Sequence, residues 1–550
     1  MIAVNLDRIG FTYATDLIFS GLTWEIHDDQ VVGLVGPNGC GKSTLLRLMV
    51  GELANDEGFI GRCKGLSIGY LAQEPLLNAG STVWQVAFSA SPDLAHVETE
   101  LDQVEEKLSD PMVYGSEILL GRVLAQQQRL LVEYERLGGP SYAGRVRSTL
   151  HSLGFNDNDM QLKVEAISGG QKKLVALARL LVNRPALLLL DEPDNHLDMD
   201  GKAFLANFIR DYEGGVVLVS HDRYLLDLVV DQIAELEDGR LTQYSGNYSE
   251  YAFEKRIKLA RQQQLFQAQQ KEITRLEQTA KRLLLWGQLY DNNKFSRRGK
   301  SILKNLEKIE RIDQPVLDRK QMRLELAGWV GSSKVLVTRD LVKVFPPSKP
   351  GQTEITVLKQ INLLVRRGER VGLIGANGSG KSLLFKIILE QEQLSSGEIE
   401  IGPSVGIGYY AQQHETLNYD QTLLDTVRLA GNYSNERAVA FLGRFLFGYR
   451  QAQEKVSTLS GGERSRLQMA LLMLSSANFL LLDEPTNNLD IASAEVLEDI
   501  LADFKGTVLV ISHDRYLLDR VVNRIEELEN GCLNSYLGNY SDYQIAKMKP

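Results

Sequence analysis

The sequence predicts two α/β units in tandem, joined by a long helical hairpin. Three observations lead to this fold class. The 550-residue chain carries SHDRYLLD twice, at Ser220–Asp227 and Ser512–Asp519, and long identities of this kind mark an internal duplication. Within each copy, short apolar runs typical of strands alternate with helical runs. Between the copies, residues 249–314 carry a two-in-seven apolar stripe, which is typical of a helix that pairs with one other helix.

Length and composition are those of a soluble protein with about three domains. The 43% apolar and 24% charged residues are ordinary for globular proteins. No apolar run reaches the roughly 18 residues that span a bilayer, and the first residues resemble a strand rather than a signal peptide. Cys40, Cys63 and Cys532 form no CxxC pair, which argues against zinc, an iron–sulfur cluster or a disulfide framework. We therefore expect a cytoplasmic location.

The two copies differ in length at one place. Lys42 and Lys381 are 339 residues apart, whereas Ser168 and Ser460 are 292 apart, so the first copy holds 47 additional residues. The excess falls at about residues 92–138, where two stretches with helical spacing are bounded by proline- and glycine-containing breaks. We expect an inserted helical arm, with extra helix packed on the domain surface as the alternative. The predicted boundaries are 1–250 for the first unit, 251–330 for the linker and 331–550 for the second unit.

Each copy contains a GxxxxGK[ST] octet between a predicted strand and a predicted helix. Glycines let backbone N–H groups converge on phosphate oxygens at a helix N-terminus, where the helix dipole also favours anions. The octet lysines supply positive charge to the β- and γ-phosphates, and the serines after them can ligate Mg²⁺. The sequence therefore predicts two phosphate-binding loops (P-loops). Their residues are Gly36, Pro37, Asn38, Gly39, Cys40, Gly41, Lys42, Ser43 and Thr44 in the first copy, and Gly375, Ala376, Asn377, Gly378, Ser379, Gly380, Lys381, Ser382 and Leu383 in the second.

Downstream of each octet, an almost wholly apolar strand ends in two acidic residues, as expected for a parallel strand covered on both faces. Asp191 and Asp483 at the strand ends would hold Mg²⁺, largely through water. The next residues, Glu192 and Glu484, could orient or deprotonate an attacking water. An isolated pair of acidic residues is more often exposed to solvent than catalytic. Here each pair follows a P-loop, which favours a catalytic role.

These motifs resemble those of ATP-binding cassette (ABC) ATPases, and the resemblance covers almost the whole chain. Ser168-Gly169-Gly170-Gln171 and Ser460-Gly461-Gly462-Glu463 resemble the family's signature motif. The resemblance implies two P-loop ATP-binding cassette domains in tandem, which close head to tail on two ATP molecules. Each nucleotide would lie between the P-loop of one cassette and the signature motif of the other. Since one chain supplies both cassettes, we expect a monomer.

The resemblance also implies roles for residues outside these motifs. Gln73 and Gln412 correspond to glutamine loops, which would join Ser43, Ser382, Asp191 and Asp483 around Mg²⁺. His221 and His513 correspond to switch histidines that act beside Glu192 and Glu484. Tyr13 and Phe345 stand where the family has an adenine-stacking aromatic, although either could be an ordinary core residue. Asn195–Asp198 and Asn487–Asp490 resemble the family's loops that cross the interface between the two cassettes. We call this interface the seam and these segments the seam loops.

Two residues depart from the family pattern. Asp194 stands where threonine is usual, and Asn488 stands where histidine is usual. Neither change removes a phosphate-, metal- or water-orienting group. We therefore expect both sites to hydrolyse ATP, although the two departures leave open whether their rates are equal.

The linker differs from the rest of the chain in charge. Residues 249–314 hold 15 Lys and Arg against 8 Asp and Glu, a net +7, whereas the whole chain is −10. The apolar stripe breaks at Gly287 and at Asp291–Asn293 and resumes from Ile302 to Ile309, which predicts a hairpin whose return helix ends before Pro315. A cationic turn with interleaved aromatics indicates nucleic-acid contact, while a solvated linker is the alternative. The basic residues at the turn are Lys281, Arg282, Lys294, Arg297, Arg298 and Lys300.

Two cassettes with a basic helical linker resemble the ABC-F proteins, in which the linker reaches ribosomal RNA and tRNA near the peptidyl-transferase centre. The resemblance implies a translation factor, and an antibiotic-resistance factor that protects the ribosome is the alternative within the family. The residues at the hairpin tip, Leu283–Phe295, would distinguish a translation factor from a resistance factor. A duplicated ATPase subunit of a membrane importer explains the cassettes but not the cationic hairpin. A chromosome-maintenance ATPase would need a far longer coiled coil within the cassette.

Overall fold

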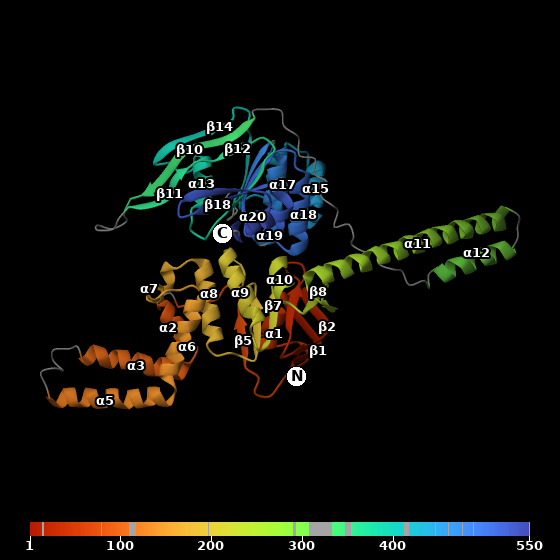
Figure 1. The fold of residues 1–550 in the computed structure, drawn as a ribbon. Helices are drawn as coiled ribbons and strands as arrows, with labels where there is room; N and C mark the ends of the chain where they lie inside the picture. The colour runs from red at the N-terminus through yellow and green to blue at the C-terminus, as the bar shows by residue number, and fades with distance from the viewer. Residues whose placement is uncertain are drawn as a thin grey trace.

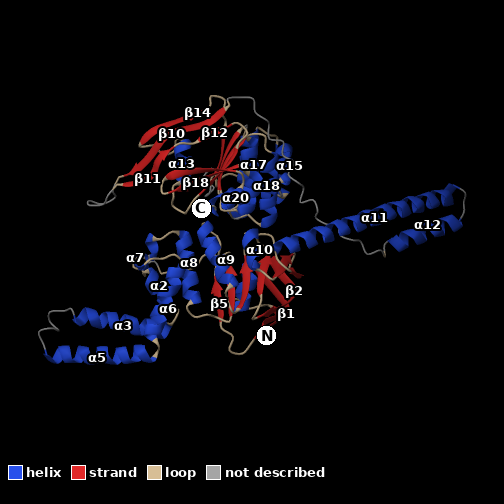
Figure 2. Cartoon of the chain, viewed as in Figure 1, coloured by secondary structure: helices blue, strands red, loops and turns tan. Residues whose placement is uncertain are grey.

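The structure is a computed structural model. It describes residues 1–13, 16–78, 80–108, 117–195, 197–289, 293–306, 308, 333–346, 354–411, 417–445, 447–459, 461–475, 477–487 and 489–548. The predicted fold class is confirmed: two α/β cassettes are joined by a long helical hairpin (Figure 1). The cassettes face each other, and the hairpin projects from one side of the pair. On the other side of the molecule, α3 (Pro92–Leu108) and α5 (Glu117–Arg136) project from the first cassette (Figure 2).

The first cassette is built on a six-stranded sheet in the order β5-β6-β7-β3-β8-β9. Its neighbours are parallel except for the antiparallel pair β8 and β9. All five residues of β6 are buried because helices or a second sheet cover both faces. The strands are β3 (Val31–Val35), β5 (Ile68–Leu71), β6 (Leu187–Asp191), β7 (Gly215–Val219), β8 (Gln232–Glu237) and β9 (Arg240–Ser245).

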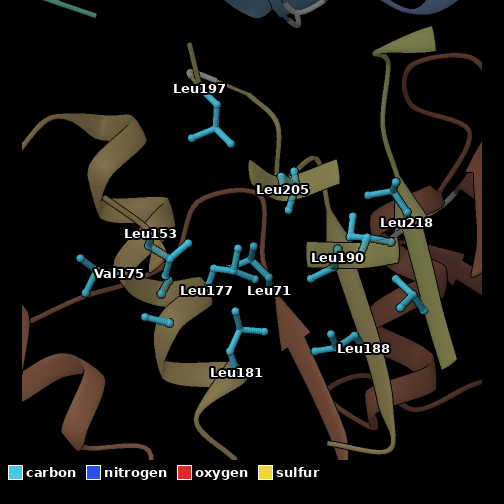
Figure 3. Close-up of a cluster of buried hydrophobic side chains, with 14 of the residues drawn as sticks. Leu71, Leu153, Val175, Leu177, Leu181, Leu188, Leu190, Leu197, Leu205 and Leu218 are labelled. Carbon is cyan, nitrogen blue, oxygen red and sulfur yellow. The ribbon is translucent and has the colours of Figure 1, made fainter. Parts of the chain in front are cut away.

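Side chains of β6 alternate between two cores, as the period of two in a strand requires. Leu188 and Leu190 pack with α8 and α9 in one core, whereas Leu187 and Leu189 pack with α1 and the antiparallel sheet β2-β1-β4 in the other. Figure 3 shows the first of these cores. The remaining elements of this cassette are β1 (Ile2–Tyr13), β2 (Asp16–His27), β4 (Glu57–Arg62), α1 (Lys42–Val50), α2 (Val83–Phe88), α6 (Gly139–Ser152), α7 (Asp157–Met160), α8 (Gly169–Leu181), α9 (Met199–Arg210) and α10 (Arg223–Val229).

The second cassette repeats this architecture with a sheet in the order β15-β16-β17-β13-β18-β19. Its antiparallel sheet has the order β11-β10-β12, and β14 also pairs with β10. The strands are β10 (Lys334–Phe345), β11 (Ile355–Ile361), β12 (Leu364–Arg366), β13 (Arg370–Ile374), β14 (Ser396–Ile401), β15 (Ile407–Tyr410), β16 (Phe479–Asp483), β17 (Thr507–Ile511), β18 (Arg524–Glu529) and β19 (Cys532–Leu537). The helices are α13 (Lys381–Ile388), α14 (Leu423–Gly431), α15 (Asn435–Arg444), α16 (Tyr449–Ala452), α17 (Gly461–Leu474), α18 (Ile491–Asp503), α19 (Arg515–Val521) and α20 (Tyr540–Met548).

The linker is formed by α11 (Tyr248–Leu289) and α12 (Asn293–Leu306). The predicted break at Gly287 is wrong, because α11 continues through it to Leu289. An isolated glycine costs a helix only about 1 kcal/mol, and the helix-forming neighbours of Gly287 outweigh that cost. The predicted turn residues Asp291 and Asn292, and Ile309 of the return helix, lie outside the described residues. Within the described residues, no helix combines the length and apolar character needed to cross a membrane.

Candidate functional site

The first P-loop lies between the end of β3 and the start of α1. Gly36 has a φ of +155°, and a Cβ there would lie 2.2 Å from the carbonyl oxygen of Leu236, so a side chain cannot be accommodated. The Lys42 ammonium donates to the carbonyl oxygens of Gly36 (2.8 Å) and Pro37 (3.0 Å). The loop thus wraps around the lysine that the sequence assigned to phosphate binding.

The second P-loop repeats this geometry between β13 and α13. Gly375 has a φ of +150°, and a Cβ there would lie 2.4 Å from the carbonyl oxygen of Leu528. The Lys381 ammonium donates to the carbonyl oxygens of Gly375 (2.7 Å) and Ala376 (2.9 Å). Both lysines are buried at the N-terminus of a helix, where the backbone favours anions.

Glu192 lies at the centre of the first site. It has a φ of +49°, an unusual conformation for a residue with a side chain. Its carboxylate accepts a hydrogen bond from Gln73 Nε2 (2.7 Å) and another from the Asn195 amide, and it lies 3.4 Å from His221 Nε2. Burial alone would raise the pKa of Glu192, but His221, Lys42 and Gln73 together hold it below its ordinary value.

Glu484 occupies the matching position in the second site, with a φ of +48°. His513 contacts it twice: the backbone N–H donates to Oε2 (3.3 Å), and Nε2 lies 3.4 Å from Oε1. Burial, reinforced by the negative charge of Asp483, raises the pKa of Glu484 to about 7. Burial, with the nearby cations Lys381 and Lys202, lowers the pKa of His513 to about 3. The two carboxylates therefore share a backbone conformation but differ in their electrostatic surroundings.

The predicted metal ligands of the first site come together. Ser43, Gln73 and Asp191 line one cavity of about 440 Å³. Asp191 is 1% exposed, neither of its carboxylate oxygens has a hydrogen-bond partner among the described residues, and burial raises its pKa. A buried carboxylate with unused oxygens fits a hard cation such as Mg²⁺. In the second cassette, Ser382 and Asp483 line one cavity, whereas Gln412 lies outside the described residues.

The seam loops connect each cassette to the P-loop of the other. Asp198 Oδ1 accepts from Gly201 N at the start of α9, and its Oδ2 accepts from the backbone N–H of Asn377 (3.2 Å) in the opposite P-loop. In the other direction, Asp490 caps α18 and its Oδ2 accepts from the backbone N–H of Asn38 (3.2 Å). The cassettes thus meet head to tail, and each P-loop contacts the opposite seam loop.

The signature motif of the first cassette faces the second P-loop across the seam. Ser168 and Gln171 form a capping box that begins α8. Ser168, Gly169 and Gly170 line a cavity of about 610 Å³ together with Glu484, His513 and the P-loop residues Asn377, Gly378, Gly380, Lys381, Ser382 and Leu383. In the second cassette, α17 begins at Gly461 and the Glu463 carboxylate accepts from Gln451 (3.0 Å). Ser460 and Asn488 lie outside the described residues.

The two aromatics proposed for adenine stacking differ in their surroundings. Phe345 lines the 610 Å³ cavity and lies 4.9 Å from the Lys343 ammonium, measured to the ring centroid. Tyr13 ends β1 and is 67% exposed. Phe345 therefore shares a cavity with the second P-loop, and the adenine-stacking role stays a prediction for both residues.

Several charged residues at the seam or beside Glu192 were not identified from the sequence. Arg223 of α10 forms a buried ion pair with Glu498 of α18. Lys202 pairs with Asp222 and reaches the opposite cassette. Lys173 donates to the carbonyl oxygen of Glu192 (2.9 Å). A position-by-position comparison of the two repeats would have found Lys202 and Lys173, whose counterparts are Ala494 and Ser465, but not Arg223, whose counterpart is Arg515.

Comparisons with known proteins agree with this geometry. A family model described as "ABC transporter" matches residues 19–195 and 358–487, and a second model with the same description matches residues 234–326. The chain is 36% identical to the ATP-binding protein YdiF of Bacillus subtilis, over 100% of this chain and 83% of that protein. It is 33% identical to ABC transporter F family member 5 of Arabidopsis thaliana, over 98% of this chain and 77% of that protein.

A third relative is the energy-dependent translational throttle protein EttA of Haemophilus influenzae, which is 35% identical over 94% of this chain and 90% of that protein. Among solved structures, an archaeal ribosome recycling factor in complex with a ribosomal stalk protein has the same fold. Its TM-score is 0.60 at 18% identity, over 98% of this chain and 92% of that chain. From the tandem cassettes and these relatives, we conclude that the chain belongs to the ABC-F family of ATP-binding cassette proteins and is an ATPase.

Proposed function

We propose that this ATPase works on the ribosome in the cytoplasm as a translation factor, and that the α11–α12 hairpin contacts RNA there. The observation that carries the proposal is the exposed basic surface at the hairpin tip. All six basic residues that cluster near the turn in the sequence are exposed on α11 and α12. Exposed cations on a projecting element suit contact with phosphates of folded RNA. These residues, the tip cations, are Lys281, Arg282, Lys294, Arg297, Arg298 and Lys300.

Packing between the two helices holds this surface in place. Trp286 of α11 and Phe295 of α12 meet edge to face, with ring centroids 6.2 Å apart. The Arg282 guanidinium lies 5.5 Å from the centroid of the Trp286 ring. A cation and a partly exposed indole side by side can stack on an unpaired base as well as contact a phosphate. The relative EttA is named as an energy-dependent translational throttle protein, which also supports a role in translation.

The seam gives the proposal its dependence on ATP. We assign Glu192 and Glu484 as the carboxylates that orient the attacking water, with His221 and His513 beside them. Mg²⁺, when bound near Asp191 and Asp483, would neutralise charge on the phosphates. Since each P-loop meets the seam loop of the opposite cassette, a triphosphate held there joins both halves. Its hydrolysis weakens the contact between the cassettes and releases the closed state.

Ribosome co-sedimentation tests the proposal. A Glu192→Gln/Glu484→Gln variant retains both nucleotide sites but cannot activate water, so it should pellet with ribosomes in ATP and remain in the supernatant in ADP. Replacing all six tip cations with alanine in that background should weaken binding. It should also lower the slope of log affinity against log salt by about 4 to 5, as expected for six lost phosphate contacts.

A matched control removes the same number of positive charges from the cassette surfaces. Its ribosome binding should stay close to that of the parent, because those residues lie away from the hairpin. Equal losses in the two variants would show that net charge, rather than the tip, determines binding, and no sedimentation in ATP would contradict the proposal itself. The six control positions, all exposed, are Lys64, Lys359, Arg366, Lys386, Arg450 and Lys505, each changed to alanine.

A further inference from the structure

Lys202 of the first cassette contacts the loop of the second cassette that carries His513, the predicted switch histidine. It lies on α9, four residues after Asp198 at the end of the seam loop, and its side chain is only 15% exposed. The ammonium donates to Asp222 Oδ2 (2.8 Å) in its own cassette and to the carbonyl oxygen of His513 (3.2 Å) in the opposite one. The second bond joins residues 311 positions apart in sequence and crosses the seam between the cassettes.

The surroundings keep this lysine charged. Burial alone would lower the pKa of Lys202, but the carboxylates of Asp222 and Asp194 raise it above its ordinary value. Asp194 is 5% exposed, and it is the residue that departs from the threonine usual at this position. Lys202 therefore has a counter-charge within its own cassette whether or not the second cassette is in contact. The bond to His513 can form and break without leaving a buried charge unpaired.

Among the residues that the structure describes, the first site receives no equivalent contact from the second cassette. At the 292-residue offset of the repeat, Ala494 corresponds to Lys202 and Thr486 corresponds to Asp194. A methyl group cannot donate a hydrogen bond, so the carbonyl of His221 receives no matching bond from Ala494. The lysine and the unusual aspartate thus occur together in the first cassette and are both replaced by uncharged residues in the second.

The contact reaches the reacting group of the second site through a single residue. The backbone N–H of His513 donates to Glu484 Oε2, and the His513 imidazole lies 3.4 Å from Glu484 Oε1. Holding the His513 carbonyl from across the seam fixes the loop on which both of these contacts depend. We infer that Lys202 is a positioning residue through which the first cassette supports ATP hydrolysis at the second cassette's site. The first site receives no such support.

This inference rests on the assignment of Glu192 and Glu484, and it does not involve the ribosome. The experiment therefore measures ATP turnover of the full chain without ribosomes. Glu192→Gln leaves only the second site active, and Glu484→Gln leaves only the first. Turnover of the double variant at background level checks the assignment separately. Each single-site background is then combined with Lys202→Ala/Asp194→Thr. This double exchange gives the first cassette the same two uncharged residues that the second cassette has at Ala494 and Thr486.

In the second-site background, the exchange should lower kcat about ten-fold, the size of one charge-assisted hydrogen bond. The KM for ATP should change by less than about two-fold, because the Lys202 ammonium donates to Asp222 and to the carbonyl of His513 rather than to the P-loop backbone. In the first-site background, kcat should stay within about two-fold of its parent. Lys202→Arg keeps the charge and a donor, and should recover most of the lost turnover.

Three results would overturn the inference. Unchanged kcat in the second-site background would show that the bond to His513 has no effect on hydrolysis. An equal loss in both backgrounds would indicate a general structural role for Lys202. A rise in KM with an unchanged kcat would show that the lysine contributes to nucleotide binding rather than to the positioning of His513.

Discussion

At the residue scale, Glu192 and Glu484 share a strained backbone conformation but not an electrostatic environment. We expect each Glu→Gln variant to lose its own site's hydrolysis about 100-fold or more, since proton transfer from the water is then unassisted. Total turnover should fall to the share of the intact site, and the double variant should fall to background. Steady-state phosphate release measures the turnover of the two single variants and of the double variant. A single variant that keeps wild-type turnover would show that its site does not contribute.

Residues whose chemistry depends on short spacing could be predicted from the sequence. A P-loop needs its glycines and lysine within eight residues, so Gly36 to Ser43 were identifiable without a structure. Lys202 and Arg223 were not, because their partners lie 311 and 275 residues away in sequence and meet them only across the seam. Asp194 was recognised as a departure from the family, but its burial beside Lys202 is visible only in three dimensions.

At the element scale, the apolar stripe of the linker predicted a helix pair correctly but placed a break too early. Leu259, Phe266 and Ile273 all lie on a half-buried stripe of α11, and Ala280 farther along is fully buried. The helix itself continues past Gly287 to Leu289, and α12 packs against α11. Glycine marks a break only where packing does not offset its low helix propensity.

Gly299 of α12 packs closely against α11. A Cβ at this position would lie 2.9 Å from Leu284 Cγ and 3.2 Å from the carbonyl oxygen of Ala280. Gly299→Leu should therefore separate the helices near the tip and destabilise their packing by about 1–3 kcal/mol. Amide hydrogen exchange of α12 should accelerate, while ATP turnover without ribosomes stays unchanged. Gly121→Leu on α5 is the control, because no atom lies within 4 Å of a Cβ there. Unchanged exchange in Gly299→Leu would contradict this packing.

At the scale of the whole molecule, both copies of SHDRYLLD lie at the seam, where α10 contacts α19. The Arg223 guanidinium lies 4.5 Å from the centroid of the Tyr516 ring, and Arg515 lies 4.1 Å from that of Tyr224. The Tyr516 hydroxyl also donates to Asp227 of the first cassette. The repeated octet is therefore self-complementary. The arginine of each copy stacks on the tyrosine of the other copy. This mutual contact gives a physical reason for the long identity of the two copies.

The self-complementary seam is nevertheless unequal, and this leads to a prediction about its stability. Arg223 pairs with Glu498, whereas the residue that corresponds to Glu498 beside Arg515 is Ala206. Arg223→Met leaves the Glu498 carboxylate, 2% exposed, with the half-exposed Arg520 as its remaining cationic partner among the described residues. We expect the seam to lose about 3–5 kcal/mol, the cost of breaking a buried ion pair from one side.

Hydrogen exchange of the α10 and α19 amides reports the free energy of this local opening. Arg515→Met is the matched control, because it removes a stacked arginine without leaving a buried carboxylate, so its cost should be smaller. A double Arg223→Met/Glu498→Leu variant should be more stable than Arg223→Met alone, since both charges are then removed together. If Arg223→Met and Arg515→Met open the seam equally, stacking rather than the ion pair stabilises it, and the two halves of the interface are energetically alike despite their different residues.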